Sequence, residues 1–156
     1  MEYALKTPQV LKVAEVELSY KSNVKPSERF KITTSNDAYQ ILIANWDPAK
    51  IELQEQFKIL LINRRNRVLG IVDLATGGVS GVVVDPKLIF VAAIKANATG
   101  VMLAHNHPSG DIHPSKADEQ VTQRLKECGR ILEVEVLDHL IISTDRFYSF
   151  ADEGLL

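Results

Sequence analysis

Cysteine is nearly absent from this chain, since Cys128 is the single one among 156 residues. One thiol excludes an internal disulfide and a paired-cysteine zinc or redox site, and it fits a reducing compartment. We therefore expect Cys128 to be a buried structural thiol. The chain also lacks any apolar run long enough to cross a bilayer. Residues 1–9 have neither the basic segment nor the apolar core of a signal peptide. These absences predict a cytoplasmic protein without membrane contact.

The chain also lacks a strong charge of either sign, because its net charge is -2 and its isoelectric point is near 6.1. Such a balance gives no overall attraction to nucleic acid or to anionic membranes. One local basic run, Lys58 with residues 64–67, is typical of a solvated hairpin. The aromatic residues, 6% of the chain, are too scattered for a base-stacking platform, so we expect Trp46 to lie in the core.

The length and the hydrophobic content of 46% predict one domain over residues 1–156 with a core of ordinary size. Residues 1–50 are predicted to form an amino-terminal extension of strand, loop and helix. This extension is expected to pack on a core domain of residues 51–156, which would hold a metal.

Hydrophobic periodicity predicts a sheet with helices on both sides, hence an α/β or α+β fold in which a mixed sheet is sandwiched by helices. Gly77, Gly78 and Gly81 lack the residues of a phosphate-binding loop and are interpreted as turns, with a substrate groove as one place for them. Asp85 followed by Pro86 marks the start of a helix. The predicted strands are 10–20, 57–62, 68–74, 101–104, 131–136, 140–143 and 147–150, and the predicted helices are 35–46, 86–97 and 115–129.

The residues with the most chemical information are concentrated between His105 and Asp118. His105 and His107 stand two positions apart at the end of the predicted buried strand 101–104. Residues two apart in an extended chain point to the same side, so the two imidazoles can converge on one ion. Asp118 falls in the first turn of the next helix, after a loop long enough to fold back.

Two imidazoles and one carboxylate leave a fourth position vacant on Zn²⁺, which is the pattern of a catalytic zinc. Zinc lowers the pKa of bound water from about 15.7 toward ~7. The hydrolysis of an amide bond then requires a carboxylate that accepts the water's proton and a donor that stabilises the oxyanion.

This stretch resembles the JAMM metalloprotease motif, because His105-x-His107, seven further residues, Ser115, two further residues and Asp118 match every fixed position. The longer form, His-Asn-His-Pro-Ser-Gly-Asp, is similar to the RadC branch of that superfamily. The resemblance covers at least residues 55–156. Outside the motif it includes Val84-x-Pro86-Lys87, Ala93-Ile94-x-x-Asn97-Ala98 and Leu137-Asp138-His139-Leu140-Ile141.

The resemblance implies a curved mixed sheet flanked by helices, a three-layer arrangement similar to that of cytidine deaminases. It implies zinc ligands at His105, His107 and Asp118. It also implies an upstream glutamate that acts on the metal-bound water, and Glu55 matches that position, with Glu52 as the alternative. Finally, it implies that the Ser115 hydroxyl stabilises the oxyanion.

Two departures from the family pattern bear on function. Only about fifty residues precede Glu55, and they lack the helix-hairpin-helix of longer RadC-like proteins, which weakens a DNA-binding role. Ile112-His113 replaces the proline and small polar residue of relatives, which adds a third imidazole near the expected metal. We interpret His113 as an exposed loop residue, and His139 as a residue that fixes a strand or supports a ligand through Asp138.

Simpler interpretations exist for the same residues. Ser115-x-x-Asp118 is also a helix-capping pattern, and Ser115 can serve both as the cap and as the oxyanion donor. The first functional hypothesis is a zinc peptidase or isopeptidase with a peptide or protein substrate. The second is a DNA-associated recombination or repair factor, and the third is a catalytically silent scaffold. No feature of the sequence specifies an oligomeric state.

Overall fold

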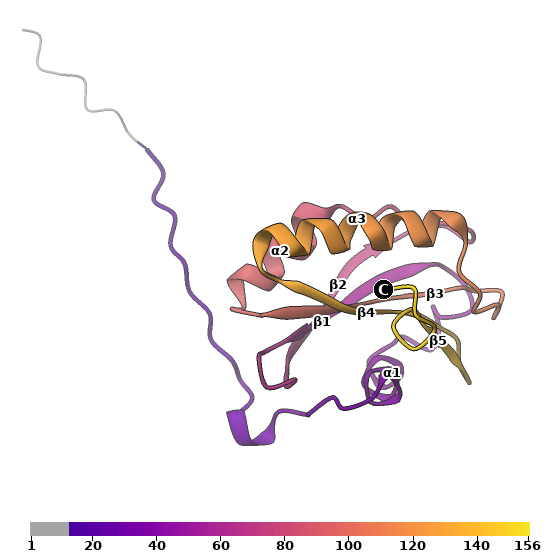
Figure 1. Cartoon of the computed structure of the whole chain (residues 1–156), viewed down its shortest axis with the longest axis horizontal. Helices are drawn as coiled ribbons and strands as arrows, with labels where there is room; N and C mark the ends of the chain where they lie inside the picture. Colours follow the sequence, from indigo (N-terminus) through magenta and orange to yellow (C-terminus); the bar gives the residue numbers. More distant parts are fainter. Residues whose placement is uncertain (1–12) are drawn as a thin grey trace, which may run out of the picture.

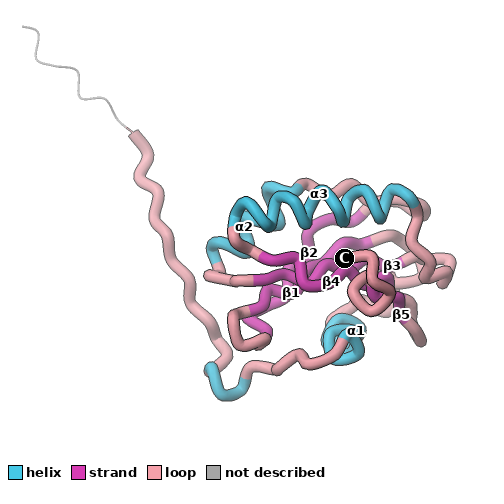
Figure 2. Tube along the Cα trace, in the orientation of Figure 1, coloured by secondary structure: helices cyan, strands magenta, loops and turns pink. Residues whose placement is uncertain are grey.

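The computed structural model describes residues 13–156, and in these residues a mixed sheet carries helices on both faces (Figure 1). Figure 2 shows the same chain with its helices, strands and loops distinguished by colour. The elements in chain order are the 3-10 helix η1 (Pro26–Glu28), α1 (Ser35–Ala44), β1 (Gln56–Ile62), β2 (Val68–Thr76), α2 (Pro86–Lys95), β3 (Gly100–Asn106), α3 (Lys116–Leu132), β4 (Glu135–Ile142) and β5 (Phe147–Ser149).

The sheet has five strands in the order β2-β1-β3-β4-β5. Only β3 and β4 run parallel, and α3 is the crossover between them, whereas the other neighbours are antiparallel. The predicted mixed sheet between helices is therefore confirmed as an α+β fold. Residues 107–115 connect β3 to α3, and the contact between His105 and Asp118 shows that the end of β3 and the first turn of α3 lie close together.

The two faces of the sheet carry separate hydrophobic cores, and α2 and α3 cover one face while α1 covers the other (Figure 1). Alternate residues of β3 enter opposite cores because side chains alternate along a strand. Val101 and Leu103 lie in the α2/α3 core, and Met102 and Ala104 lie in the α1 core. The same alternation directs His105 to the α2/α3 face, which is also the side from which α3 approaches.

Most predicted elements are confirmed within a few residues. The hairpin of β1 and β2 forms around the polar tip, and Asp85 caps α2 with Pro86 in the first turn. Helix α1 begins at Ser35 as predicted, and Trp46 is buried in the α1 core. Cys128 is half-buried against the α2/α3 core rather than fully buried.

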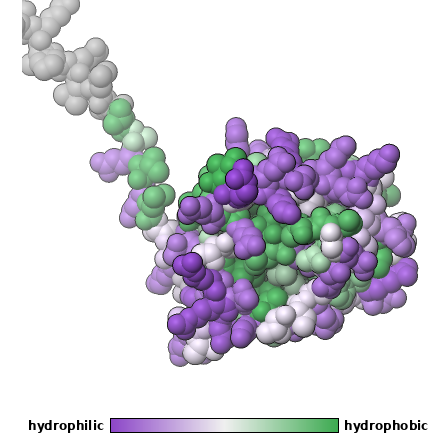
Figure 3. Space-filling view, viewed as in Figure 1, coloured by the Kyte–Doolittle hydropathy of each residue, from purple (hydrophilic) through white to green (hydrophobic). Residues whose placement is uncertain are grey.

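The predicted strand over residues 10–20 is wrong in its described part, and residues 10–12 lie outside the described residues. Residues 13–20 have no regular secondary structure and lead away from the sheet (Figure 1). Val16 and Leu18 are 86% and 87% exposed, and Figure 3 shows apolar side chains along this segment. An alternating pattern produces a strand only where a neighbouring strand pairs with it, and residues 13–156 provide no such neighbour here.

The carboxyl-terminal prediction is also partly wrong. Residues 131 and 132 end α3, Glu133 takes a left-handed conformation, and one strand, β4, replaces the two predicted over 131–136 and 140–143. Asp138 and His139 lie between the two predicted strands, but both are buried inside β4. Their polar atoms have hydrogen-bond partners, so they interrupt the apolar pattern without interrupting the strand.

The basic run does not form one surface. Lys58 is 4% exposed, forms an ion pair with Asp73 and lies over the Trp46 ring, so its interpretation as a solvated residue is wrong. Arg64, Arg65 and Asn66 are exposed at the hairpin tip as predicted, whereas Arg67 is half-buried. Among the described residues, no helix combines the length and the apolar character of a membrane span.

Candidate metal centre

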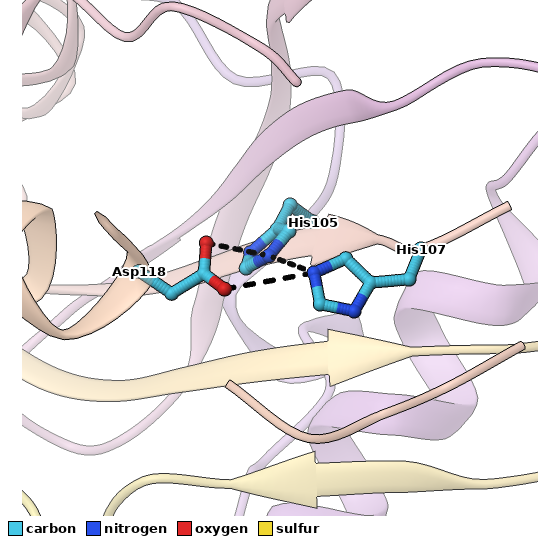
Figure 4. A group of neighbouring side chains, drawn as sticks. All are labelled: His105, His107 and Asp118. Carbon is cyan, nitrogen blue, oxygen red and sulfur yellow. Dashed lines mark hydrogen bonds and ion pairs between the residues drawn. The ribbon is translucent and has the colours of Figure 1, made fainter. Parts of the chain in front are cut away.

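Three side chains from two adjacent elements converge beside the α2/α3 face of the sheet. His105 lies near the end of β3, His107 follows that strand, and Asp118 lies in the first turn of α3 (Figure 4). One potential ligand atom of each residue lies within 4.8 Å of the corresponding atoms of the other two. The structure thus brings together the three residues that the sequence predicted as metal ligands.

The distances between these ligand atoms fit one tetrahedral ion. The Nε2 atoms of His105 and His107 are 3.1 Å apart. Asp118 Oδ1 is 3.2 Å from His105 Nε2, and Asp118 Oδ2 is 3.6 Å from His107 Nε2. Ligands bound at about 2.0–2.1 Å with tetrahedral angles lie about 3.3–3.4 Å apart. The 3.1 Å between the two nitrogens lies near this value, and one carboxylate oxygen of Asp118 lies within 4.8 Å of both of them, so the donor set can surround a single cation.

Hydrogen bonding prepares His107 as a ligand. Its Nδ1 lies 2.6 Å from the backbone carbonyl oxygen of Asp111, which can only accept. Nδ1 of His107 therefore donates, and Nε2 of the neutral ring carries the lone pair that faces His105 and Asp118. The adjacent Asp118 carboxylate raises the pKa of His107, so the site favours positive charge at this position.

Asp118 is both a helix-capping residue and a candidate ligand. Its Oδ2 accepts hydrogen bonds of 2.7 Å from the backbone N–H and the hydroxyl of Ser115, and its own N–H donates to Ser115 Oγ. Burial acts to raise the pKa of Asp118, but the adjacent His105 and His107 rings and the hydrogen bonds from Ser115 outweigh it and hold the pKa well below its usual range. The carboxylate is thus ionised at neutral pH, as a metal ligand must be.

Glu55 faces the same site from the start of β1, the strand that pairs with β3. It immediately precedes β1, and paired backbone hydrogen bonds fix it, from Glu55 N to the Gly78 oxygen and from Gly77 N to the Glu55 oxygen. Glu55 Oε1 lies 3.8 Å from His107 Nε2. Burial raises the pKa of Glu55. Glu52, the alternative, is exposed and lines a different cavity.

A cleft of about 340 Å³ opens at the three side chains. Its polar wall is formed by Glu55, Ser115 and the candidate ligands, and its remaining walls are mostly apolar. Gly81 borders it, in agreement with the interpretation of this glycine segment as turns beside a groove. The other lining residues are Phe57, Ser80, Val82, Val84, Ala117 and Val121.

Two further histidines behave differently from each other. His113 is exposed and pairs with Asp111 at 2.7 Å, so it lies outside the cluster of three, as expected of a loop residue. His139 is fully buried and contacts His105 directly, with 2.8 Å between His139 Nε2 and His105 Nδ1. The predicted route through Asp138 is wrong, because the Asp138 carboxylate accepts hydrogen bonds from the His139 backbone, Ser149 and Ala151 instead.

The sequence interpretation missed Thr122 altogether. This residue is 3% exposed, and its hydroxyl lies 2.6 Å from His139 Nδ1. Its position one helical turn after Asp118 places it on the same side of α3 as the candidate ligand. In the sequence, the role of Thr122 was indicated only by its position four residues after Asp118, on the inward face of an amphipathic helix.

Comparisons with known proteins show what this chain is similar to. The model of the family described as "RadC-like JAB domain" matches residues 22–155. A UPF0758 protein of Flavobacterium johnsoniae is 42% identical over 145 residues, which cover 92% of this chain and 62% of the relative. A UPF0758 protein of Clostridium kluyveri is 38% identical over 151 residues, or 97% of this chain and 64% of the relative. This chain therefore spans less than two thirds of the length of these two curated relatives.

Proposed function

This chain belongs to the RadC-like JAB domain family, and from that premise we propose that it is a zinc-dependent metallohydrolase that cleaves a peptide or isopeptide bond. The observation that carries the proposal is the convergence of His105, His107 and Asp118 at one end of a cleft that Glu55 also faces. Three ligands from the protein leave an ion with room for water, which is typical of catalytic rather than structural zinc.

Zinc suits this donor set because two imidazole nitrogens and one carboxylate oxygen are ligands that it commonly takes. When bound, it would lower the pKa of its water toward ~7 and polarise the scissile carbonyl. The protein holds the three donors at the spacing of one ion before any substrate arrives, since backbone and capping contacts fix His107 and Asp118.

Glu55 is proposed as the general base and acid. Its carboxylate lines the same cleft as Asp118 and lies 3.8 Å from His107 Nε2, so it can accept a proton from water held beside these residues. Burial raises its pKa, which brings its proton affinity nearer to that needed for transfer to a leaving amine.

Ser115 is proposed as the oxyanion donor. It borders the cleft, but its hydroxyl donates to Asp118 Oδ2. The capping interaction of its backbone N–H with the same oxygen would persist if the hydroxyl rotated toward a substrate. Ser115 can therefore change its hydrogen-bond acceptor without releasing the start of α3.

An extended peptide is the proposed substrate form. Between β2 and α2, Val82 and Val84 pack against the α2/α3 core while Val83 is 90% exposed, which is the alternation of an extended segment. No backbone hydrogen bond joins residues 82–84 to another strand within residues 13–156. A substrate that added a strand here would run along the cleft wall next to the metal ligands.

The proposal is tested by metal content together with cleavage. Purified protein should contain about one zinc per chain by elemental analysis, and His107→Ala should lose it, while His113→Ala, which changes an exposed histidine outside the cluster, should retain it. Glu55→Gln should retain zinc and lose cleavage of a peptide library and of isopeptide-linked substrates. Stoichiometric zinc in His107→Ala would refute the ligand assignment, and equal cleavage by Glu55→Gln and the wild type would refute the role of Glu55.

A DNA-associated role is the second hypothesis, and its structural support is limited to Arg64 and Arg65 at the hairpin tip. Arg64 borders a cavity that Glu133 and Glu135 also line, which reduces the local positive potential. A gel-shift titration against salt distinguishes this hypothesis, because phosphate contacts give affinity that falls steeply as salt rises. Absence of binding at low salt would exclude it.

A further inference from the structure

A buried chain of hydrogen bonds connects two of the candidate ligands through residues that do not face the cleft. The Thr122 hydroxyl lies 2.6 Å from the backbone oxygen of Asp118 and 2.6 Å from His139 Nδ1. His139 Nε2 then lies 2.8 Å from His105 Nδ1. Thr122 and His105 are each 3% exposed and His139 is fully buried, so protein groups rather than bulk water determine the position of each proton.

The direction of each hydrogen bond follows from the acceptor at one end. A backbone carbonyl cannot donate, so the Thr122 hydroxyl must donate its single proton to the Asp118 oxygen. The Thr122 oxygen can then only accept from His139, which requires that His139 carries a proton on Nδ1.

His139 is neutral in this setting. Its ring stacks on Phe150 with 4.9 Å between the centroids, and Phe57 covers another side. The ring nitrogens of His139 contact Thr122 and His105 and no carboxylate, and a charged imidazolium without a carboxylate partner is unfavourable in a fully buried, apolar site. Since the one ring proton is on Nδ1, Nε2 of His139 is an acceptor, and His105 Nδ1 must donate to it.

The result at His105 is a single tautomer. A proton on Nδ1 leaves the lone pair on Nε2, and Nε2 is the atom that lies 3.2 Å from Asp118 Oδ1 and 3.1 Å from His107 Nε2. The other tautomer would place a proton on Nε2, between these groups, and would prevent His105 from binding a cation through this atom.

We propose that Thr122 and His139 are positioning residues that fix His105 in the Nδ1–H tautomer and thereby set the metal affinity of the site. The inference rests on the proposed function in assigning His105 as a metal ligand. The chain of hydrogen bonds starts at the backbone of Asp118 and ends at His105, so the same two residues also tie the start of α3 to β3 through β4.

Thr122→Val removes the hydroxyl with little change of shape, and Thr122→Ser is its matched control because it keeps the hydroxyl. In Thr122→Val, the Nδ1–H of His139 would be buried without an acceptor, which is more costly than an unused acceptor. His139 should therefore move its proton to Nε2 and donate to His105 Nδ1, which reverses the His105 tautomer.

The tautomers are measured on metal-free protein by long-range ¹H–¹⁵N correlation spectra of the histidine rings. Wild type and Thr122→Ser should show His105 protonated at Nδ1, and Thr122→Val should show a dominant Nε2–H form. Zinc affinity, measured by competition with a chromophoric chelator, should fall by about 10–100-fold in Thr122→Val. It should stay within a few-fold of wild type in Thr122→Ser.

A second pair of variants covers the possibility that Thr122→Val does not fold. His139→Phe fills the aromatic site without an acceptor for His105, whereas His139→Gln offers an amide oxygen. His139→Phe should weaken zinc binding, and His139→Gln should restore part of it. An unchanged His105 tautomer in Thr122→Val, or equal zinc affinities for His139→Phe and wild type, would overturn the inference. The metal-free spectra separate this result from a failure of the proposed function, which would appear as absent zinc binding in the wild type.

Discussion

The carboxylate of Asp118 is divided between two partners: Oδ2 accepts two hydrogen bonds from Ser115, and Oδ1 lies 3.2 Å from His105 Nε2. In a capping box, the acidic side chain normally only accepts the hydrogen bond that stabilises the first turn of the helix. Here that contact also holds the second oxygen toward the histidines. The start of α3 and the candidate metal centre therefore depend on the same side chain.

Two substitutions should separate the role of Asp118 in capping α3 from its role as a metal ligand. Ser115→Ala removes the capping hydroxyl and should lower the free energy of unfolding by about 1 kcal/mol, the usual value for a lost helix cap. Zinc should remain bound, with lower affinity, because the backbone N–H of Ser115 still orients the carboxylate. Asp118→Asn should lose stoichiometric zinc, because it replaces an ionised ligand with a neutral amide. Chemical denaturation and elemental analysis measure the two effects, and a Ser115→Ala protein with no zinc would contradict the division.

Gly77 and Gly78 are adjacent, but only Gly78 is predicted to tolerate a substitution by alanine. A Cβ atom on Gly77 would lie 1.9 Å from the backbone oxygen of Gly81, whereas one on Gly78 meets no atom within 4 Å. Gly77→Ala should therefore displace the turn that pairs with Glu55, reduce cleavage strongly, and cost about 1–3 kcal/mol of stability. Gly78→Ala should leave both near wild type. Activity and thermal unfolding of the two variants are compared directly, and equal behaviour would exclude a role for this close approach.

The sequence predicted most of this site because the responsible patterns are local. The spacing of His105 and His107 agrees with an extended strand, and the Ser115–Asp118 spacing agrees with a helix start, so each pair carries its own geometry. Their convergence was indicated by the loop length and by the family resemblance. The Asp118 carboxylate meets the histidines because β3 and α3 are consecutive elements joined at the same edge of the sheet.

The parts that were mispredicted depend on distant partners. Val16 and Leu18 carry the alternation of a strand but have no neighbouring strand within the described chain. His139 interrupts the apolar pattern of β4, yet it is buried because Thr122 and His105, from two other elements, satisfy both of its ring nitrogens. Sequence periodicity reports the hydrophobicity of a position and not the partner that a polar side chain finds there.

Glu55→Gln should change stability in a pH-dependent direction. Burial raises the pKa of Glu55 above its usual 4.5, so ionising it in the metal-free folded protein is unfavourable. The protonated carboxyl contributes stability that is fully present below pH 4.5, where it is also protonated in the unfolded chain. This contribution is lost as pH rises through the raised pKa. The neutral amide should therefore make metal-free Glu55→Gln at least as stable as wild type at pH 7, and any advantage should vanish below pH 4.5.

Thermal unfolding across pH measures this difference, and it must be done with a chelator present, since a bound cation would favour the ionised carboxylate. The same group should define the acidic limb of the cleavage profile, because only ionised Glu55 can accept the water's proton. If metal-free Glu55→Gln were markedly less stable than wild type at neutral pH, the ionised Glu55 carboxylate would have stabilising partners besides His107.

Removal of zinc should lower the thermal stability of the wild type, because an ion that binds only the folded state stabilises it by mass action. At a free zinc concentration 100 times the dissociation constant, the gain is about 2.7 kcal/mol, and a chelator should abolish it.

The converging donors predict an additional effect in this fold. The lone pairs on Nε2 of His107 and Nε2 of His105 face each other across 3.1 Å and repel. A cation or a proton bound between these two atoms relieves the repulsion. His107→Ala should therefore show no zinc-dependent shift in its unfolding temperature, and it should lose less stability than an ordinary half-buried histidine. His113→Ala should retain the full shift, and a zinc-dependent shift of equal size in both variants would mean that the stabilising ion binds elsewhere.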